Sequence, residues 1–215
     1  MTPPLWCSPH VHVAKVDDDV LVLDVLNDRY HCLLNAADSL GIGKKGALAP
    51  TDAGIRAELQ AVGFAEATPP ASERLDPILP QRELALSPKP PRLEVINAAL
   101  AWGVASVIFR GKPLSALIRY HHALSRSRTG DADEARLADI VGAARKVRPW
   151  IPFEGACLQR SFQLRCHLAT RGVATDWVFG VRTWPFSAHC WLQIGDLVVG
   201  DRLTRVLRYT PILRA

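Results

Sequence analysis

A proline-rich segment near the middle of the chain limits how it can fold. Residues 69–91 contain seven prolines, and proline ends helices and is excluded from central strands. The charge balance also changes here: residues 1–90 carry 8 basic and 12 acidic side chains, whereas residues 91–215 carry 18 and 9. We therefore expect two domains, residues 1–68 and 92–215, joined by an extended, semi-rigid linker over residues 69–91.

The composition favours a folded chain that is not exported. Apolar residues make up 48% of it, and the first 13 residues contain no basic segment followed by an apolar run, so no secretory signal is expected. The weakly polar run over residues 95–109 is shorter than the roughly 18 residues that cross a bilayer, which predicts a buried core helix and no membrane partner. Five cysteines without an export signal indicate reduced thiols and a cytoplasmic location.

The segment that begins at Cys157 predicts an activated thiol at the start of a helix. Proline and glycine residues precede Cys157, so no earlier helix runs into it. The pattern predicts an amphipathic helix over residues 157–171, closed by Gly172. In the first turn, unpaired N–H groups and the helix dipole favour a thiolate. The apolar residues that recur at spacings of three and four are Leu158, Phe162, Cys166 and Ala169.

A second segment supplies a base and an acid. Residues 187–194 alternate like a strand, Gly195-Asp196 is a turn signal, and residues 197–199 form a return strand. Such a hairpin places His189 opposite Asp201 or one residue away. A thiol nucleophile needs a base, and the base needs a carboxylate. Cys157 must reach this pair through tertiary packing, whereas Cys190 alternates to the strand face opposite His189.

Together these motifs resemble the transglutaminase-like cysteine peptidase domain of lasso-peptide B proteins, over about residues 92–215. The resemblance implies that Cys157 is the nucleophile, His189 the base and Asp201 the orienting acid. The motifs that carry it are Pro152-Phe153-Glu154, Cys157 to Ser161, Arg171-Gly172-Val173, Gly180-Val181-Arg182, Pro185 to Trp191, and Asp201.

This resemblance also implies an activity and partners. Members of this family are hydrolases that remove the leader from a ribosomally made precursor peptide through an acyl-enzyme. A separate lasso cyclase, of the asparagine-synthetase-like type, then uses ATP to close the ring of the core. We therefore expect the precursor peptide and the cyclase as partners, and no cofactor in this chain.

The first 68 residues predict strands followed by small helices. Short strands are expected at about residues 11–13, 20–23 and 29–33, a short helix from Asn35 to Leu40, a loop over residues 41–50, and a helix from Thr51 to Gly63. This order suits a winged-helix module, which makes the whole chain an α+β protein. Helices are expected over residues 92–148, the first of them marked by Leu93, Ile96, Leu100, Val104 and Val107.

Within this module, three motifs resemble the peptide-recognition elements of the pyrroloquinoline-quinone D type: Val22-Leu23-Asp24, Asn27 to Tyr30, and Leu33 to Asn35. The resemblance implies that a leader peptide adds a strand to the edge of the sheet. The expected leader-binding residues are Arg29, Tyr30, His31, Cys32, Leu33, Ile55 and Leu59.

Several other functions were weighed. The cysteines and histidines show no C-x2-C or H-x3-H pair, so no metal site is expected. The basic second half carries no RNA motif, zinc finger or basic zipper region, so no nucleic-acid partner is expected. Two alternatives stay open, because a transglutaminase-like acyl transferase shares the acyl-enzyme and a non-catalytic scaffold could bind the leader without cleaving it.

Overall fold

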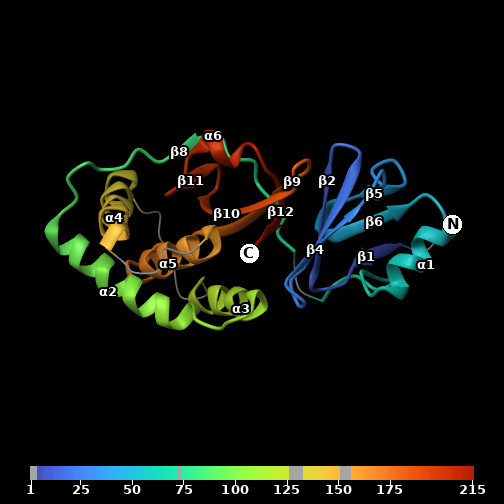
Figure 1. Ribbon diagram of the computed structural model, residues 1–215, viewed down its shortest axis with the longest axis horizontal. Helices are drawn as coiled ribbons and strands as arrows, with labels where there is room; N and C mark the ends of the chain where they lie inside the picture. Colours follow the sequence, from blue (N-terminus) through green and yellow to red (C-terminus); the bar gives the residue numbers. More distant parts are fainter. Residues whose placement is uncertain (1–3, 72–73, 126–132, 151–155) are drawn as a thin grey trace. The chain divides into compact units, whose positions relative to one another are not determined.

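The computed structural model, shown in Figure 1, describes residues 4–71, 74–125, 133–150 and 156–215. The chain forms two compact units. Residues Met1–Pro77 group with Phe179–Ala188 and Tyr209–Arg214 in the first unit, and the remaining residues form the second. The division into independent domains at residues 68 and 92 stays a prediction, because the first unit also takes in two segments from the C-terminal part of the chain.

Two small antiparallel sheets form most of the first unit. One has the strand order β2-β3-β4, and the other has the order β5-β6-β1-β7. The helix α1 (Ala53–Ala61) begins at Asp52, whose carboxylate accepts a hydrogen bond from the Ile55 N–H. The strands are β1 (Leu5–Cys7), β2 (Val11–Val16), β3 (Asp19–Asp24), β4 (Arg29–Leu33), β5 (Leu40–Ile42), β6 (Ala47–Pro50) and β7 (Ala65–Glu66).

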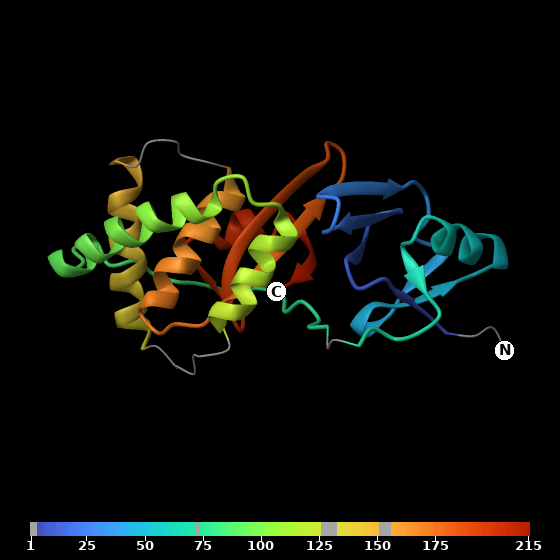
Figure 2. The same ribbon diagram turned by 90° about the horizontal axis from the view of Figure 1, so that it is seen from below.

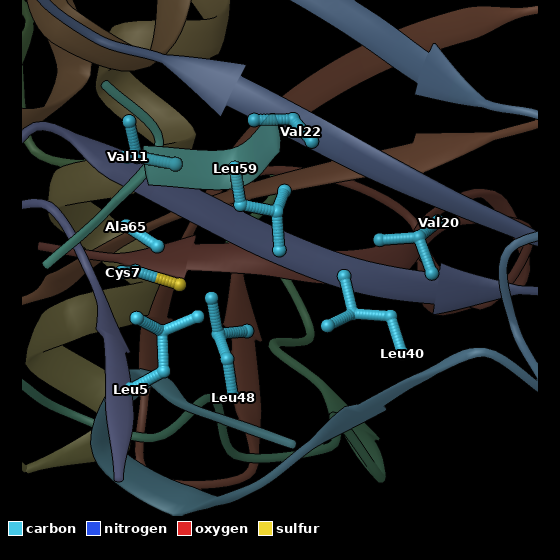
Figure 3. Packing of buried hydrophobic residues seen from close by; sticks show 9 residues of the cluster. All are labelled: Leu5, Cys7, Val11, Val20, Val22, Leu40, Leu48, Leu59 and Ala65. Carbon is cyan, nitrogen blue, oxygen red and sulfur yellow. The ribbon is translucent and has the colours of Figure 1, made fainter. Parts of the chain in front are cut away.

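Side chains from both sheets and from α1 meet in one apolar core. Figure 3 shows them pointing toward one another between the strands. Burial of such side chains contributes roughly 1.5–3 kcal/mol each, so this cluster stabilises the unit. Its buried members are Leu5, Cys7, Val11, Val20, Val22, Leu40, Leu48, Leu59 and Ala65.

The winged-helix prediction is not confirmed. The expected helix from Asn35 to Leu40 is wrong, because Asn35 has φ 54° and its N–H donates to Asp19 Oδ1, which makes a turn. The segment 41–50, expected to be a loop, instead contains the paired strands β5 and β6. The strands at residues 20–23 and 29–33 and the helix after Thr51 are confirmed.

Four helices dominate the second unit. They are α2 (Arg92–Phe109), α3 (Leu114–Ser125), α4 (Glu134–Val147) and α5 (Cys157–Thr170). α5 contacts the other three, and α2 contacts both α4 and α5, an arrangement seen in Figure 2. Most of α5 is therefore buried on all sides, which fixes the position of its first residue, Cys157.

The orientation of α2 differs from the prediction. Its small residues and one tryptophan face inward, at Ala98, Trp102 and Ala105, because small side chains let neighbouring helices approach closely. The prediction of a buried core helix is wrong, since the apolar stripe that marked it, Leu93, Ile96, Leu100, Val104 and Val107, is 57–76% exposed. Among the described residues, α2 alone has the length and apolar composition of a membrane-crossing helix. One such helix is weak evidence for a membrane span, because a core helix of a soluble protein passes the same test.

A five-stranded sheet completes the fold, with the order β12-β9-β10-β11-β8. Its edge strand β8 (Arg82–Glu83) pairs in parallel with β11 and comes from the segment predicted to be a linker. The next residue, Leu84, is buried, so this part of the segment is packed into the sheet. The other strands are β9 (Asp176–Arg182), β10 (Ser187–Ile194), β11 (Leu197–Val199) and β12 (Thr210–Arg214).

Candidate active site

Cys157 is the first residue of α5, as the sequence predicts. The first N–H groups of a helix have no partner within it, and they present a partial positive charge. Gly172 follows the helix with φ 77°, so the predicted end is also confirmed. The motif at Pro152–Glu154, with the residues up to Gly155, lies outside the described residues.

His189 and Asp201 are neighbours in the predicted hairpin. The ladder pairs Leu192 with Val199 and Ile194 with Leu197, which puts His189 one register position away from Asp201. His189 Nε2 lies 2.6 Å from Asp201 Oδ2, and the ring stacks on Trp191 with centroids 6.1 Å apart. Asp201 Oδ1 accepts a further hydrogen bond from the Arg202 N–H at 2.8 Å. The carboxylate and the ring are thus held in one orientation.

A glycine makes this geometry possible. Gly200 follows β11 with φ 80°, a left-handed conformation that other residues adopt at a cost. A Cβ at this position would lie 2.4 Å from Leu164 Cδ2 of α5. Gly200 therefore lets the chain turn out of β11 against α5, and Asp201 follows directly after that turn.

Cys157 interacts with His189 and also with Cys190. The Cys157 thiol forms hydrogen bonds with the His189 side chain and with both the thiol and the backbone N–H of Cys190. Strand alternation predicts Cys190 on the face opposite His189, yet the side chains of both residues interact with Cys157. The ladder to β11 ends at Leu192, and the thiol lies against the strand backbone beyond that point, where the side chains of two successive residues are within its reach.

Ser161 fixes the first turn of α5 beside this thiol pair. Its hydroxyl donates to the Cys157 carbonyl at 2.9 Å and accepts from Trp177 Nε1 at 2.8 Å. Ser161 Oγ also lies 3.3 Å from Cys190 Sγ. Because Trp177 is fully buried, the network links the nucleophile's turn to the core of the sheet. No local pattern in the sequence indicates the contact between Ser161 and Cys190.

The electrostatics of the cluster favour a thiolate beside a charged imidazole. The hydrogen bond from the Cys190 thiol lowers the pKa of Cys157 most. Burial opposes this effect, and the interactions with His189 add to it, so that the pKa falls to about 4. Burial lowers the pKa of His189, but its bonds to Asp201 and Cys157 outweigh this effect and raise it. The pKa of Asp201 is lowered, because the bonds from His189 and the Arg202 N–H outweigh burial. These shifts all favour ionised side chains near neutral pH.

The three side chains open into one cavity of about 740 Å³. Cys157, His189, Cys190 and Asp201 all line it. A cavity of this size accepts a short peptide segment or a small ligand. Among the described residues, no group of three or more histidine, cysteine or carboxylate side chains is placed to hold a metal ion.

The predicted leader-binding residues lie in the first unit and divide into two kinds. β4, which holds Arg29 to Leu33, is an edge strand of its sheet. Two of its side chains contact aromatic neighbours at a tilt: Tyr30 contacts Phe186, and His31 contacts Phe64. Cys32 is exposed. On α1, by contrast, Leu59 is buried and Ile55 is partly buried against the core, so the leader-binding role of these two residues stays a prediction.

A family model described as "Transglutaminase-like superfamily" matches residues 99–214, more than half of the chain. The chain belongs to this superfamily. Its members are often cysteine peptidases or acyl transferases, and both activities use a thiol nucleophile. Within the matched region lie Cys157, His189 and Asp201.

Part of the chain is also similar in sequence to a characterised protein. The Microcin J25-processing protein McjB of Escherichia coli is 39% identical to this chain over 49 residues, which are 23% of this chain and 24% of that protein. The match thus spans about a quarter of the relative's length. No solved structure matches the chain.

Proposed function

We propose that this chain is a cysteine endopeptidase that removes the leader from a lasso-type precursor peptide. The observation that carries the proposal is the cluster at the start of α5, where Cys157 contacts a His189 ring that is itself bonded to Asp201. The partial match to McjB supports a precursor peptide as the substrate.

The chemistry follows from the charge states. The Cys157 thiolate attacks the carbonyl carbon of the scissile peptide bond, and the unpaired N–H groups of a helix start can stabilise the oxyanion. The His189 imidazolium then gives its proton to the leaving amine, which becomes the N-terminus of the core. Water, deprotonated by the neutral imidazole, hydrolyses the thioester. The products are a leader with a free carboxylate and a core with a free amine.

Asp201 is proposed to orient the base. Its bond to Nε2 leaves Nδ1 as the ring nitrogen that serves Cys157, since the imidazole has only these two. The carboxylate also stabilises the positive charge that the ring carries between the two steps. The amine that leaves when the acyl-enzyme forms is the group through which a separate lasso cyclase of the asparagine-synthetase-like type would close the ring, and ATP belongs to that enzyme.

Leader binding is proposed for β4 of the first unit. As an edge strand, β4 has backbone groups on one side that are not paired within its sheet, and a leader in extended conformation could add a strand there. A proline placed in the strand-forming part of the leader should weaken binding sharply, because it removes a backbone donor. The same leader with alanine at that position is the control, and equal affinity for both peptides would contradict strand addition.

Mass spectrometry of a precursor incubated with the protein tests the function. The probe is a full-length synthetic lasso-type precursor peptide, and the matched variant is Cys157→Ala. The proposal expects two fragments whose masses add up to the precursor plus one water, and none with the variant. A product that carries an added amine acceptor would instead indicate an acyl transferase. Binding without any product would indicate a scaffold.

A further inference from the structure

The cavity that contains Cys157 is unusually rich in one kind of charge. Six of the chain's 20 arginines line it, and no lysine does. They come from segments far apart in the sequence, namely the end of α4 with the following turn, α5, and the α6 region (Leu203–Val206). The six are Arg145, Arg148, Arg160, Arg202, Arg205 and Arg208.

The carboxylates that line the same cavity are already engaged. Asp201 is bonded to His189 and to the Arg202 N–H. Glu83 accepts a hydrogen bond from the Leu203 N–H at 2.7 Å. With two carboxylates against six guanidinium groups, the described lining carries an excess of four positive charges, since the Cys157 thiolate and the His189 imidazolium offset each other.

Local structural needs do not explain this excess. Arg145 stands in the last turn of α4, where a cation interacts favourably with the helix dipole. Arg202, by contrast, stands at the N-terminal end of α6, where a positive charge gains nothing from the helix. Arg205 lies 4.0 Å from Asp201, and both Arg202 and Arg208 are exposed. A cleft with one sign of charge concentrates field lines and attracts ligands of the opposite sign.

Building on the proposed function, we propose that this cleft selects a peptide segment with Asp or Glu side chains close to the scissile bond. Guanidinium groups pair with carboxylates through two parallel hydrogen bonds, so several arginines around one thiol read acidic side chains on the substrate. The thiolate itself is anionic, and the surrounding arginines offset the repulsion between it and an acidic substrate. Acidic residues thus serve as a specificity signal at the cleavage site, separate from leader recognition by the first unit.

A binding experiment tests this without depending on cleavage. The full chain with Cys157→Ala is titrated with three fluorescent peptides of equal length that carry Glu, Gln or Lys at the same two positions. We expect the Glu peptide to bind about tenfold more tightly than the Gln peptide, and the Lys peptide to bind more weakly than either. The preference should shrink as salt is added, because the charges at the cleft mouth are exposed.

Variants locate the effect. In the Cys157→Ala chain, the further substitutions Arg145→Gln and Arg208→Gln should remove most of the preference for the Glu peptide. In the protein that keeps Cys157, the same pair should raise KM more than it lowers kcat. The matched control pair is Arg92→Gln and Arg110→Gln, which removes the same charge from exposed positions outside the cavity and should leave the preference intact. Unfolding curves of both pairs verify that each remains folded.

Each outcome has a defined meaning. Equal affinity for Glu and Gln peptides overturns the inference while cleavage of a precursor still supports the peptidase. A preference for Glu that survives in the Arg145/Arg208 pair, or that the control pair also loses, overturns the assignment to this cleft. A single-stranded oligonucleotide that displaces the Glu peptide at lower concentration than unlabelled Glu peptide does would show a general polyanion surface instead. A preference for Glu in a protein that cleaves no precursor would leave the cleft assignment standing and overturn the peptidase.

Discussion

Removing the Cys190 thiol should change the pH dependence of Cys157 without abolishing its reactivity. The Cys190 thiol is the largest single influence that lowers the pKa of Cys157 to about 4. A hydrogen bond to a charged group contributes about 1.5–3 kcal/mol, and one pKa unit corresponds to 1.36 kcal/mol. Because Cys157 is only half-buried, solvent screening favours the lower end, so Cys190→Ala should raise the pKa by roughly one unit.

The sign of this change fixes the expected profile. Protonation of Cys157 limits its reaction at low pH, so a raised pKa moves the acid limb of the rate profile to higher pH. Near pH 7 the thiolate remains the main form in both proteins, and the rates should agree within about twofold. Cys190→Ser keeps a donor at the same position and should retain most of the wild-type profile.

Alkylation measures this directly. Iodoacetamide is added at a series of pH values, and modification of the peptide that contains Cys157 is followed by mass spectrometry, which separates it from the four other cysteines. Acid limbs that superimpose for the wild type and Cys190→Ala would refute the donor role of Cys190. If Cys190→Ser shifts the limb as much as Cys190→Ala does, the sulfur acts through its size and not through its proton.

Further predictions concern the base, its carboxylate and the backbone turn. His189→Ala should lower the rate of cleavage by about 10²–10⁴-fold, measured at substrate saturation, while peptide binding to the first unit persists. Asp201→Asn should keep the fold but lower kcat by at least about 10²-fold, since the imidazole loses its orienting charge; an unchanged pH–rate profile would contradict this. Gly200→Ala should cost about 2–4 kcal/mol in urea unfolding, from strain at φ 80° and a Cβ 2.4 Å from Leu164. Gly172→Ala, with φ 77° and open space around the new Cβ, should cost only about 1–2 kcal/mol.

The sequence predicts the parts of the site whose geometry is local. Periodicity places Cys157 at the start of a helix, and the turn at Gly195 sets the register that brings His189 near Asp201. The structure has both features. The contact between Cys157 and Cys190 depends on where the β10–β11 ladder ends and how α5 approaches it. Such tertiary details have no signature in the spacing of residues.

Two errors in the fold have similar causes. The strands β5 and β6 are short and contain few β-branched residues. The sequence therefore favours a helix over residues 35–40 and a loop over residues 41–50 instead of strands. For α2, the pattern gave a helix with a strong apolar stripe, but which face becomes buried depends on its neighbours. Ala98 and Ala105 admit close packing that the larger side chains on the other face do not.

The composition of the first unit has a consequence for how the chain folds during synthesis. Besides its N-terminal part, this unit contains Phe179–Ala188 and Tyr209–Arg214, and within it β12 packs against β2. During synthesis β2 therefore waits for about 200 further residues before β12 (Thr210–Arg214) is made and the two strands can pack. Until then, one side of that strand lacks its native contact, which is the state in which nascent sheets tend to aggregate. The first unit is therefore completed only after the helices of the second unit have been synthesised.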